Sequence, residues 1–260
     1  VTAAFENYEF YRAMQSLNQF TNVALSAFYF DISKDCLYAN STCDSTRRSV
    51  QTVLFHTLVN YTTAIAPITP HLAEEVWEFF RQVRVDFGHD GFSVFQEPWD
   101  QTRREWDNKE LAEEWDALRL IRSLSNKAIE ATRQGKAIGS SLEAELDIYV
   151  SLETRIGQTL LKYKDDLQQL CITSDARIHG ISEDSDTPAA GSDADVFVSE
   201  ENVFSFGTET AVRVKCRRSL LHKCPRCWNF HSVEADSLCT RCDDALNNSN
   251  SNSNNDAGNI

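Results

Sequence analysis

The chain has 260 residues, 42% of them hydrophobic and 25% charged, with a formal net charge of −14 at pH 7. This length allows one large domain or two ordinary ones, each with its own core. No stretch approaches the roughly 20 apolar residues of a membrane span, so we expect a soluble globular protein with no membrane partner. The negative charge argues against a protein that coats nucleic acid along its whole surface, although a local basic face remains compatible with it.

Three helices are predicted in the first third of the chain. Apolar residues recur at three- and four-residue intervals through residues 1–30, which predicts one long helix followed directly by a turn. A second helix should start with Asp44 or Ser45 as its N-cap and end before Pro67, because proline cannot continue the hydrogen-bond ladder. A third should open at Pro70. Short connections between these helices predict an antiparallel bundle.

A fourth long helix is predicted from about Arg103 to Gln134, with Gly135 as its C-terminal stop. Before it, the helical period is lost and Phe92–Phe95 is interpreted as a short extended piece. A solvated face is the default interpretation for the basic residues of this helix, and nucleic-acid contact is the alternative. These residues are Arg119, Arg122, Lys127 and Arg133.

The pattern changes after Gly139. Glu143–Val150 alternates apolar and polar side chains, as a half-exposed strand does, and 153–170 returns to a helical period. The loop 181–195 is acidic. Further short strands are expected at Cys171–Thr173, Val196–Val198 and Ala211–Lys215.

Two C-x-x-C pairs, Cys224-Pro-Arg-Cys227 and Cys239-Thr-Arg-Cys242, lie eleven residues apart near the end of the chain. This spacing is the signature of a structural zinc site in which four thiolates bind one ion. Two disulfides are disfavoured because no secretion signal is visible, and a redox C-x-x-C would not normally come duplicated. The intervening segment is too short for a core, so the metal should supply most of its folding free energy. The other four cysteines are interpreted as free thiols in a reducing compartment, namely Cys36, Cys43, Cys171 and Cys216.

Cations and one aromatic residue flank the predicted zinc ligands. Lys223, Arg226 and Arg241 lie next to the cysteines, and Trp228 directly follows the second of them. A rigid loop that presents cations beside an exposed ring suits phosphates and an unstacked base. The alternative, that Trp228 packs on the knuckles as a miniature core, stays equally open.

No catalytic motif is present: the sequence has no nucleophile elbow, Gly-rich phosphate loop or metalloprotease pair. His56 and His71 are interpreted as packed or surface histidines. Adjacent carboxylates such as Glu74 and Glu75 are interpreted as solvated helix surface. We therefore predict a binding module without catalytic residues of its own.

Two segments carry a family resemblance. Thr46–His56 running into Ala66–Trp77 resembles the anticodon-binding helical domain of class I aminoacyl-tRNA synthetases for branched aliphatic amino acids and methionine. Gly139–Ala144, followed by Lys223–Trp228 and Cys239–Cys242, is similar to the carboxy-terminal region of bacterial-type isoleucyl-tRNA synthetases.

The resemblance implies a mainly α fold, with a class I anticodon-binding bundle followed by a small α+β module and a zinc-knuckle domain. In this family the bundle docks on the anticodon stem-loop of isoleucine tRNA, and the zinc module helps to hold it. The family's zinc ligands carry over to Cys224, Cys227, Cys239 and Cys242. Contacts with tRNA are inferred for Arg47, Arg48, Lys223, Arg226, Trp228 and Arg241.

In this family the ATP-dependent charging of tRNA with isoleucine belongs to an upstream catalytic domain, whose signature motifs do not occur here. We therefore expect a piece of a longer protein that is inactive alone, with ATP bound only by the missing domain. It should be a monomer continuous with, or docking on, that domain, in the cytoplasm or, in a eukaryote, the mitochondrial matrix. The expected parts are a bundle (1–135), an α+β junction module (136–215), a zinc module (216–246) and a disordered Asn/Ser tail (247–260).

Two other functions stay open. The chain can be a freestanding zinc-ribbon module for nucleic acid, including DNA, since base-excision glycosylases end in a similar four-cysteine finger. It can also be an acidic protein-interaction scaffold.

Overall fold

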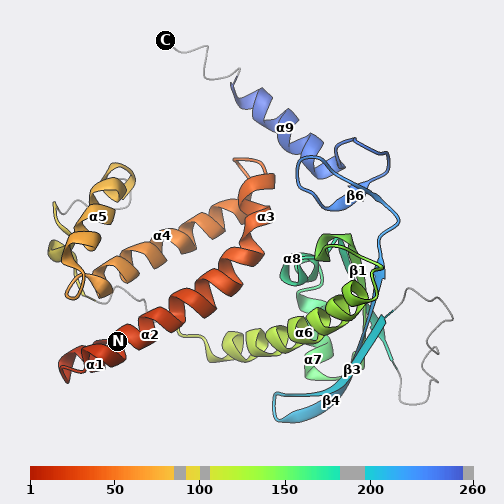
Figure 1. Ribbon diagram of the computed structural model, residues 1–260, viewed down its shortest axis with the longest axis horizontal. Coiled ribbons are helices and arrows are strands. Elements are labelled where there is room, and N and C mark those ends of the chain that lie inside the picture. The colour runs from red at the N-terminus through yellow and green to blue at the C-terminus, as the bar shows by residue number, and fades with distance from the viewer. Residues whose placement is uncertain (85–91, 100–105, 182–196, 254–260) are drawn as a thin grey trace. The chain divides into compact units, whose positions relative to one another are not determined.

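A computed structural model describes residues 1–84, 92–99, 106–181 and 197–253, with side chains left out at 81–84 and 248–253. The chain forms two compact units (Figure 1). Unit 1 comprises Val1–Leu37 and Thr42–Asp107, and unit 2 comprises Tyr38–Ser41 and Asn108–Ile260. The predicted acidic loop at 181–195 lies almost entirely outside the described residues.

Helices make up the described part of unit 1. In chain order they are α1 (Thr2–Glu6), α2 (Phe10–Gln19), the π-helical η1 (Phe20–Phe30), most of α3 (Asp31–Ala39), α4 (Ser45–Ile65), α5 (Pro70–Arg84) and the 3-10 turn η3 (Val94–Gln96).

The prediction of one helix over residues 1–30 followed by a turn is wrong at both ends. Tyr8 has a left-handed backbone with φ of 58°, and it separates α1 from α2. At the other end the chain stays helical through α3. No Gly or Pro interrupts this stretch, and Lys34 pairs with Asp31 at 3.1 Å, one helical turn away.

The boundaries of α4 and α5 follow the predicted signals. The Asp44 carboxylate accepts a hydrogen bond from the Arg47 backbone N–H at 2.8 Å, which makes Asp44 the N-cap of α4. The helix ends at Ile65, with Ala66 as its C-cap before Pro67, and α5 begins at Pro70. Local signals therefore set the start and end of α4 and the start of α5.

The core of unit 1 forms where α4, α5 and η3 meet α2. Its buried residues are Leu17, Val59, Ile65, Ala66, Ala73, Trp77, Phe80 and Val94. The predicted extended piece at Phe92–Phe95 is wrong, because Ser93 and Gln96 form a capping box that closes a 3-10 turn instead.

Unit 2 is built on a four-stranded sheet of order β2-β1-β4-β3. Its strands are β1 (Ala144–Val150), β2 (Asp175–Gly180), β3 (Phe197–Ser205) and β4 (Thr208–Arg218). β1 runs parallel to β2 and antiparallel to β4. Residues in β1 and β4 alternate between buried and more exposed, and α6 (Lys109–Gln134) lies along the sheet (Figure 1).

The short elements of this unit depart from the sequence prediction in two places. The helix expected at 153–170 is two helices, α7 (Arg155–Lys162) and α8 (Leu167–Cys171). The strand expected at Cys171–Thr173 is wrong, because Ile172 closes α8 in a left-handed conformation with φ of 55° and β2 starts only at Asp175. β1 was predicted in place, and β2 was not predicted. β3 and β4 overlap the strands predicted at Val196–Val198 and Ala211–Lys215 but are longer, and Val196 lies outside the described residues.

The last part of unit 2 holds β5 (His222–Lys223), β6 (Phe230–Ser232) and α9 (Thr240–Ser253), with the short 3-10 turn η5 (Ser141–Glu143) ahead of β1. The tail predicted to be disordered from residue 247 is helical as far as Ser253, because α9 continues from the second cysteine pair. Residues 254–260 lie outside the described part.

A mainly helical fold is confirmed, whereas the bundle arrangement and the four-part division stay predictions. None of the helices in the described ranges could span a membrane.

Candidate metal centre

The two C-x-x-C pairs come together in the structure. The Sγ atoms of Cys224, Cys227, Cys239 and Cys242 all lie within 4.8 Å of one another. Three of the four residues are buried and Cys227 is half-buried. The cluster is therefore compact and largely shielded from water.

Backbone hydrogen bonds shape the first pair into a knuckle. The Cys224 carbonyl accepts from the Trp228 N–H, and the Cys224 N–H donates to the Asn229 carbonyl, both at 2.9 Å. Trp228 adopts a left-handed backbone with φ of 68°, which reverses the chain after Cys227. The knuckle thus turns both sulfurs of this pair to the same side.

The second pair lies at the start of α9. The Cys239 carbonyl accepts from the backbone N–H groups of Cys242 and Asp243, each at 3.0 Å. The Cys239 N–H in turn donates to the Cys224 Sγ at 3.4 Å, which joins the two pairs.

The spacing of the sulfurs fits a tetrahedral metal site. A Zn–S distance of about 2.3 Å places tetrahedral ligands about 3.8 Å apart. The Sγ atoms of Cys227 and Cys239 are 3.8 Å apart. Soft thiolates are the ligands that zinc prefers in structural sites, so these four residues can hold such an ion.

Electrostatics in the cluster also favour a cation. Burial raises the pKa of the Cys224 thiol, but N–H groups of Cys227, Cys239 and Arg226 stabilise the thiolate and lower it to about 6. Burial and the neighbouring Cys239 and Cys242 instead raise the pKa of Cys227 to about 12. Thiolates this close together repel one another, and a divalent cation between them offsets the repulsion by attracting each of them.

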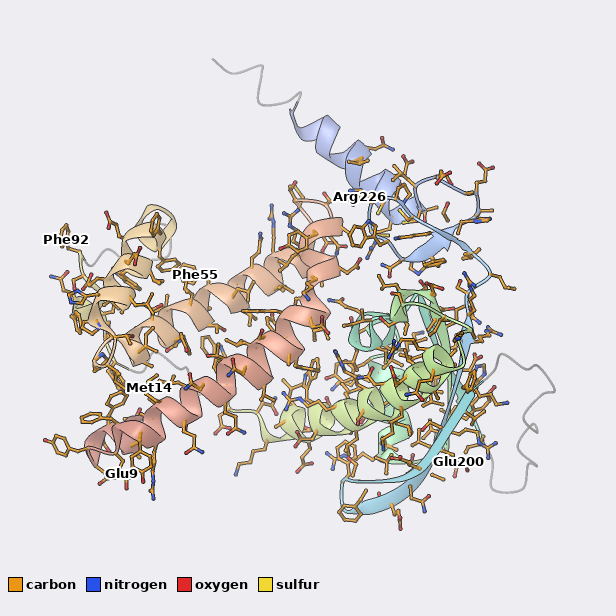
Figure 2. The ribbon with its side chains drawn as sticks, in the orientation of Figure 1. Glu9, Met14, Phe55, Phe92, Glu200 and Arg226 are labelled. Carbon is orange, nitrogen blue, oxygen red and sulfur yellow. The ribbon has the colours of Figure 1, made fainter. Side chains whose placement is uncertain are left out.

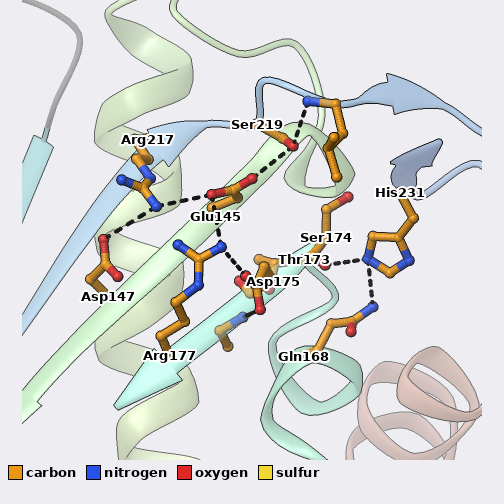
Figure 3. A network of polar contacts seen from close by, with 12 residues as sticks. Glu145, Asp147, Gln168, Thr173, Ser174, Asp175, Arg177, Arg217, Ser219 and His231 are labelled. Carbon is orange, nitrogen blue, oxygen red and sulfur yellow. Dashed lines mark hydrogen bonds and ion pairs between the residues drawn. The ribbon is translucent and has the colours of Figure 1, made fainter. Parts of the chain in front are cut away.

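Hydrogen bonds hold β6, the strand between the pairs, against α8 and the turn that follows it (Figure 3). The Phe230 N–H donates to the Ser174 hydroxyl at 2.6 Å, and the His231 ring Nε2 bonds to the Ser174 carbonyl. Gln168 contacts the same ring nitrogen at 3.3 Å. Sequence reasoning missed these three polar residues, because nothing local marks residues that meet only in the folded unit.

β4, which precedes the cysteines, contains three arginines that pair with carboxylates of neighbouring residues. Glu145 lies opposite Arg217 in the β1–β4 register and accepts from Arg217 at 3.1 Å and from the Ser219 hydroxyl at 2.8 Å (Figure 3). Arg213 pairs with Glu200 at 2.7 Å. These arginines therefore stabilise strand pairing.

Among the predicted contact residues, Lys223 and Trp228 form an exposed pair. The Trp228 ring is 60% exposed and is therefore not the core of the knuckles. The Lys223 Nζ lies 5.1 Å from the ring centroid, in cation–π geometry.

The remaining predicted contacts differ in their surroundings. Arg226 is half-buried, and its guanidinium donates to the Ala39 carbonyl; Arg241 is also half-buried. Arg47 and Arg48 lie in the first turn of α4, in unit 1.

The basic face of α6 is engaged within the protein. Lys127 pairs with Glu201 at 2.5 Å, and Arg133 pairs with Glu130 at 2.8 Å. Arg122 donates to the Leu170 carbonyl at 2.9 Å. The Lys127 and Arg133 side chains are more than half exposed, as the default interpretation of a solvated face expects, and the nucleic-acid alternative stays a prediction.

A known protein family matches the helical part of the chain. The family model of the anticodon-binding domain of tRNA ligase matches residues 1–149, which is more than half of the chain. The chain belongs to this family.

Relatives of this member of the anticodon-binding family are isoleucine–tRNA ligases. Those of Gloeobacter violaceus, Thermosynechococcus vestitus and Pasteurella multocida are 35%, 36% and 33% identical to it. The matches cover 95%, 95% and 94% of this chain but 23%, 25% and 24% of the relatives. The chain thus spans about a quarter of the length of these curated relatives, and the predicted resemblance to isoleucyl-tRNA synthetases is confirmed.

Proposed function

We propose that the chain recognises the anticodon arm of isoleucine tRNA, as the carboxy-terminal part of an isoleucine–tRNA ligase in translation. The family match over residues 1–149 carries this proposal. The similarity to isoleucine–tRNA ligases supports it, because it extends over 95% of the chain and so includes the cysteine-containing part. ATP-dependent charging of the tRNA would be the work of the catalytic domain of such an enzyme.

We also propose that the metal is one structural zinc ion. The support comes from four sulfurs within 4.8 Å of one another and from a donor set of thiolates alone. The closed set leaves no ligand position for a reacting water, so the ion would fix the knuckles and take no part in bond making.

The exposed pair Lys223 and Trp228 is the proposed centre of the RNA contact. An exposed ring offers a stacking face to an unstacked base, and a lysine beside it can pair with a phosphate. Arg241, Arg47 and Arg48 are proposed to contact the RNA backbone. Arg226 donates one N–H to Ala39 and would reach RNA only with its remaining donors.

A binding titration tests the proposal. The probe is an RNA hairpin with the anticodon stem-loop of isoleucine tRNA, and the competitors are the same stem with another loop and a DNA duplex. We expect the isoleucine hairpin to bind most tightly, with an affinity that falls steeply as salt rises, because phosphate contacts release counterions.

Tighter binding of the DNA duplex would favour the zinc-ribbon module. Absence of RNA binding even at low salt would favour the acidic scaffold. Either result would contradict the proposed function.

We further propose that the chain acts as a monomer. The compartment would be the cytoplasm, or the mitochondrial matrix in a eukaryote. Sedimentation with and without the hairpin should give one chain per particle.

A further inference from the structure

A cationic side chain from a distant part of the sequence lies at the C-terminal end of α3. The last four carbonyls of a helix lack partners within the helix, and a positive charge near them is stabilising. The last turn of α3 contains no basic residue of its own. Arg226, which is 187 positions away in sequence, donates to the carbonyl of Ala39, the last residue of α3.

The same guanidinium nitrogen faces the cysteine cluster. Arg226 Nη1 lies 3.5 Å from the Sγ of Cys242, which is 0% exposed. Four thiolates around a divalent cation keep a net negative charge, so a guanidinium beside them is favourable. Arg226, which is labelled in Figure 2, thus bridges the helix end and the proposed metal site through these two contacts.

This placement differs from that of an ordinary surface cation. Lys223, in the same knuckle, is exposed and lies over the Trp228 ring. Arg226 is half-buried, and its acceptor residue Ala39 is only 3% exposed. A buried carbonyl at a helix end needs a donor, and the described structure supplies Arg226.

We propose that Arg226 is a positioning residue that makes the order of Tyr38–Ser41, the last two residues of α3 and the first two of its connection to α4, depend on metal loading of the cysteine cluster. Arg226 lies between the ligands Cys224 and Cys227, so the knuckle fixes its backbone. The knuckle is too short to fold on its own core, and it holds Arg226 in place only with the metal bound. Without the metal, Ala39 loses its donor.

Hydrogen exchange of the full chain, without RNA, tests this inference. In the zinc-loaded protein, amides in a peptide covering residues 36–43 should be protected. Removal of zinc with a chelator should raise their exchange about tenfold, and Arg226→Gln should give the same rise with zinc retained. This change corresponds to about 1.4 kcal/mol, the scale of one hydrogen bond from a charged donor.

Two further variants separate the causes. Arg226→Lys keeps the charge but not the planar fork, so it should retain zinc while peptide 36–43 exchanges faster. The matched control is Arg218→Gln, which removes an exposed arginine of the same unit and should leave the exchange unchanged. Zinc content is read in each variant with a colorimetric chelator, and far-UV circular dichroism verifies folding.

Wild-type exchange in folded, zinc-loaded Arg226→Gln would overturn the positioning role. Unchanged exchange after chelation of the wild type would overturn the dependence on metal. The inference rests on the proposed zinc site but not on RNA recognition. A failure of tRNA binding alone would therefore contradict the proposed function and leave this inference standing.

Discussion

The Trp228 side chain is exposed at a position where the backbone is left-handed. Its left-handed φ of 68° reverses the chain after the second cysteine, and the ring remains 60% exposed beside Lys223. An exposed tryptophan held by a rigid knuckle loses little conformational entropy when a base stacks on it.

Replacement of this ring should weaken RNA binding and leave the metal in place. Base stacking contributes about 1–3 kcal/mol, so Trp228→Ala should raise the Kd for the isoleucine hairpin about 5- to 150-fold. Trp228→Phe should restore most of the affinity. Fluorescence anisotropy at constant salt measures the change.

The matched control is Phe204→Ala, since Phe204 is 70% exposed on the β3–β4 hairpin of the same unit. It should leave the Kd unchanged. Equal losses in Trp228→Ala and Phe204→Ala would show a general effect of exposed rings and not a stacking site.

Glu114 contributes to the stability of unit 2 and not to binding. It is 8% exposed, and its carboxylate accepts from Lys162 at 2.7 and 2.8 Å and from the Tyr163 hydroxyl at 2.7 Å. The Lys162 bonds, followed by the Tyr163 bond, lower the pKa of Glu114 below its ordinary value. The charged form is therefore the one that stabilises the fold.

Glu114→Gln should lower the free energy of unfolding at pH 7 by about 1–2 kcal/mol, because a charge-assisted hydrogen-bond network is lost. The lowered pKa means that this stabilisation is present above about pH 4.3, the pKa of an unfolded glutamate, and disappears as pH falls through the folded pKa. The difference between variant and wild type should therefore shrink toward pH 3 in urea titrations.

The neighbouring Glu113→Gln is the control. Glu113 pairs with Arg155 at 3.3 Å, but both side chains are more than half exposed, so its loss should change stability by less than about 0.5 kcal/mol. A Glu114→Gln defect that is the same at pH 7 and pH 3 would refute the electrostatic explanation.

At the scale of elements, the sequence predicted those ends that local chemistry sets. Asp44 caps α4, Pro67 follows its last turn and Pro70 opens α5, all of which can be read from neighbouring residues. The strand predicted at Cys171–Thr173 failed, because apolar content over three residues does not distinguish a strand from a helix end. In the structure, the left-handed conformation of Ile172 ends α8 at this point, so the segment forms a helix end and not a strand.

Gly157 shows a constraint that only packing reveals. A Cβ on Gly157 would lie 2.2 Å from the Ser151 carbonyl oxygen and 2.9 Å from the Leu152 Cα, both backbone atoms of the turn before α7. Glycine is normally unfavourable inside a helix by about 1 kcal/mol relative to alanine. Here the close approach of the two backbones requires it.

Gly157→Ala should therefore destabilise the chain by about 1–3 kcal/mol, despite the better helix propensity of alanine. Thermal or urea unfolding measures the change. Gln158→Ala, at the next and exposed position of α7, should stay within about 0.5 kcal/mol of wild type. A stabilised Gly157→Ala variant would mean that α7 moves away from the turn at little cost.

For the whole molecule, the cysteine set and the family could be predicted from the sequence. The contacts that hold the cysteine module against the rest of unit 2 could not. The spacing of the two C-x-x-C pairs is local and specific. In contrast, the contacts of His231 with Ser174 and of Arg226 with Ala39 join residues 57 and 187 positions apart. A single sequence contains no signal for such pairs.

The proposed function requires that the metal-bound cysteine module contributes to recognition of isoleucine tRNA. The most direct measurement is the Kd for isoleucine tRNA of the zinc-loaded chain and of the same sample after chelation, with circular dichroism recorded on both. We predict one zinc per chain and a Kd that rises at least tenfold on chelation, while most helical signal remains. An unchanged Kd after complete removal of the metal would contradict the claim.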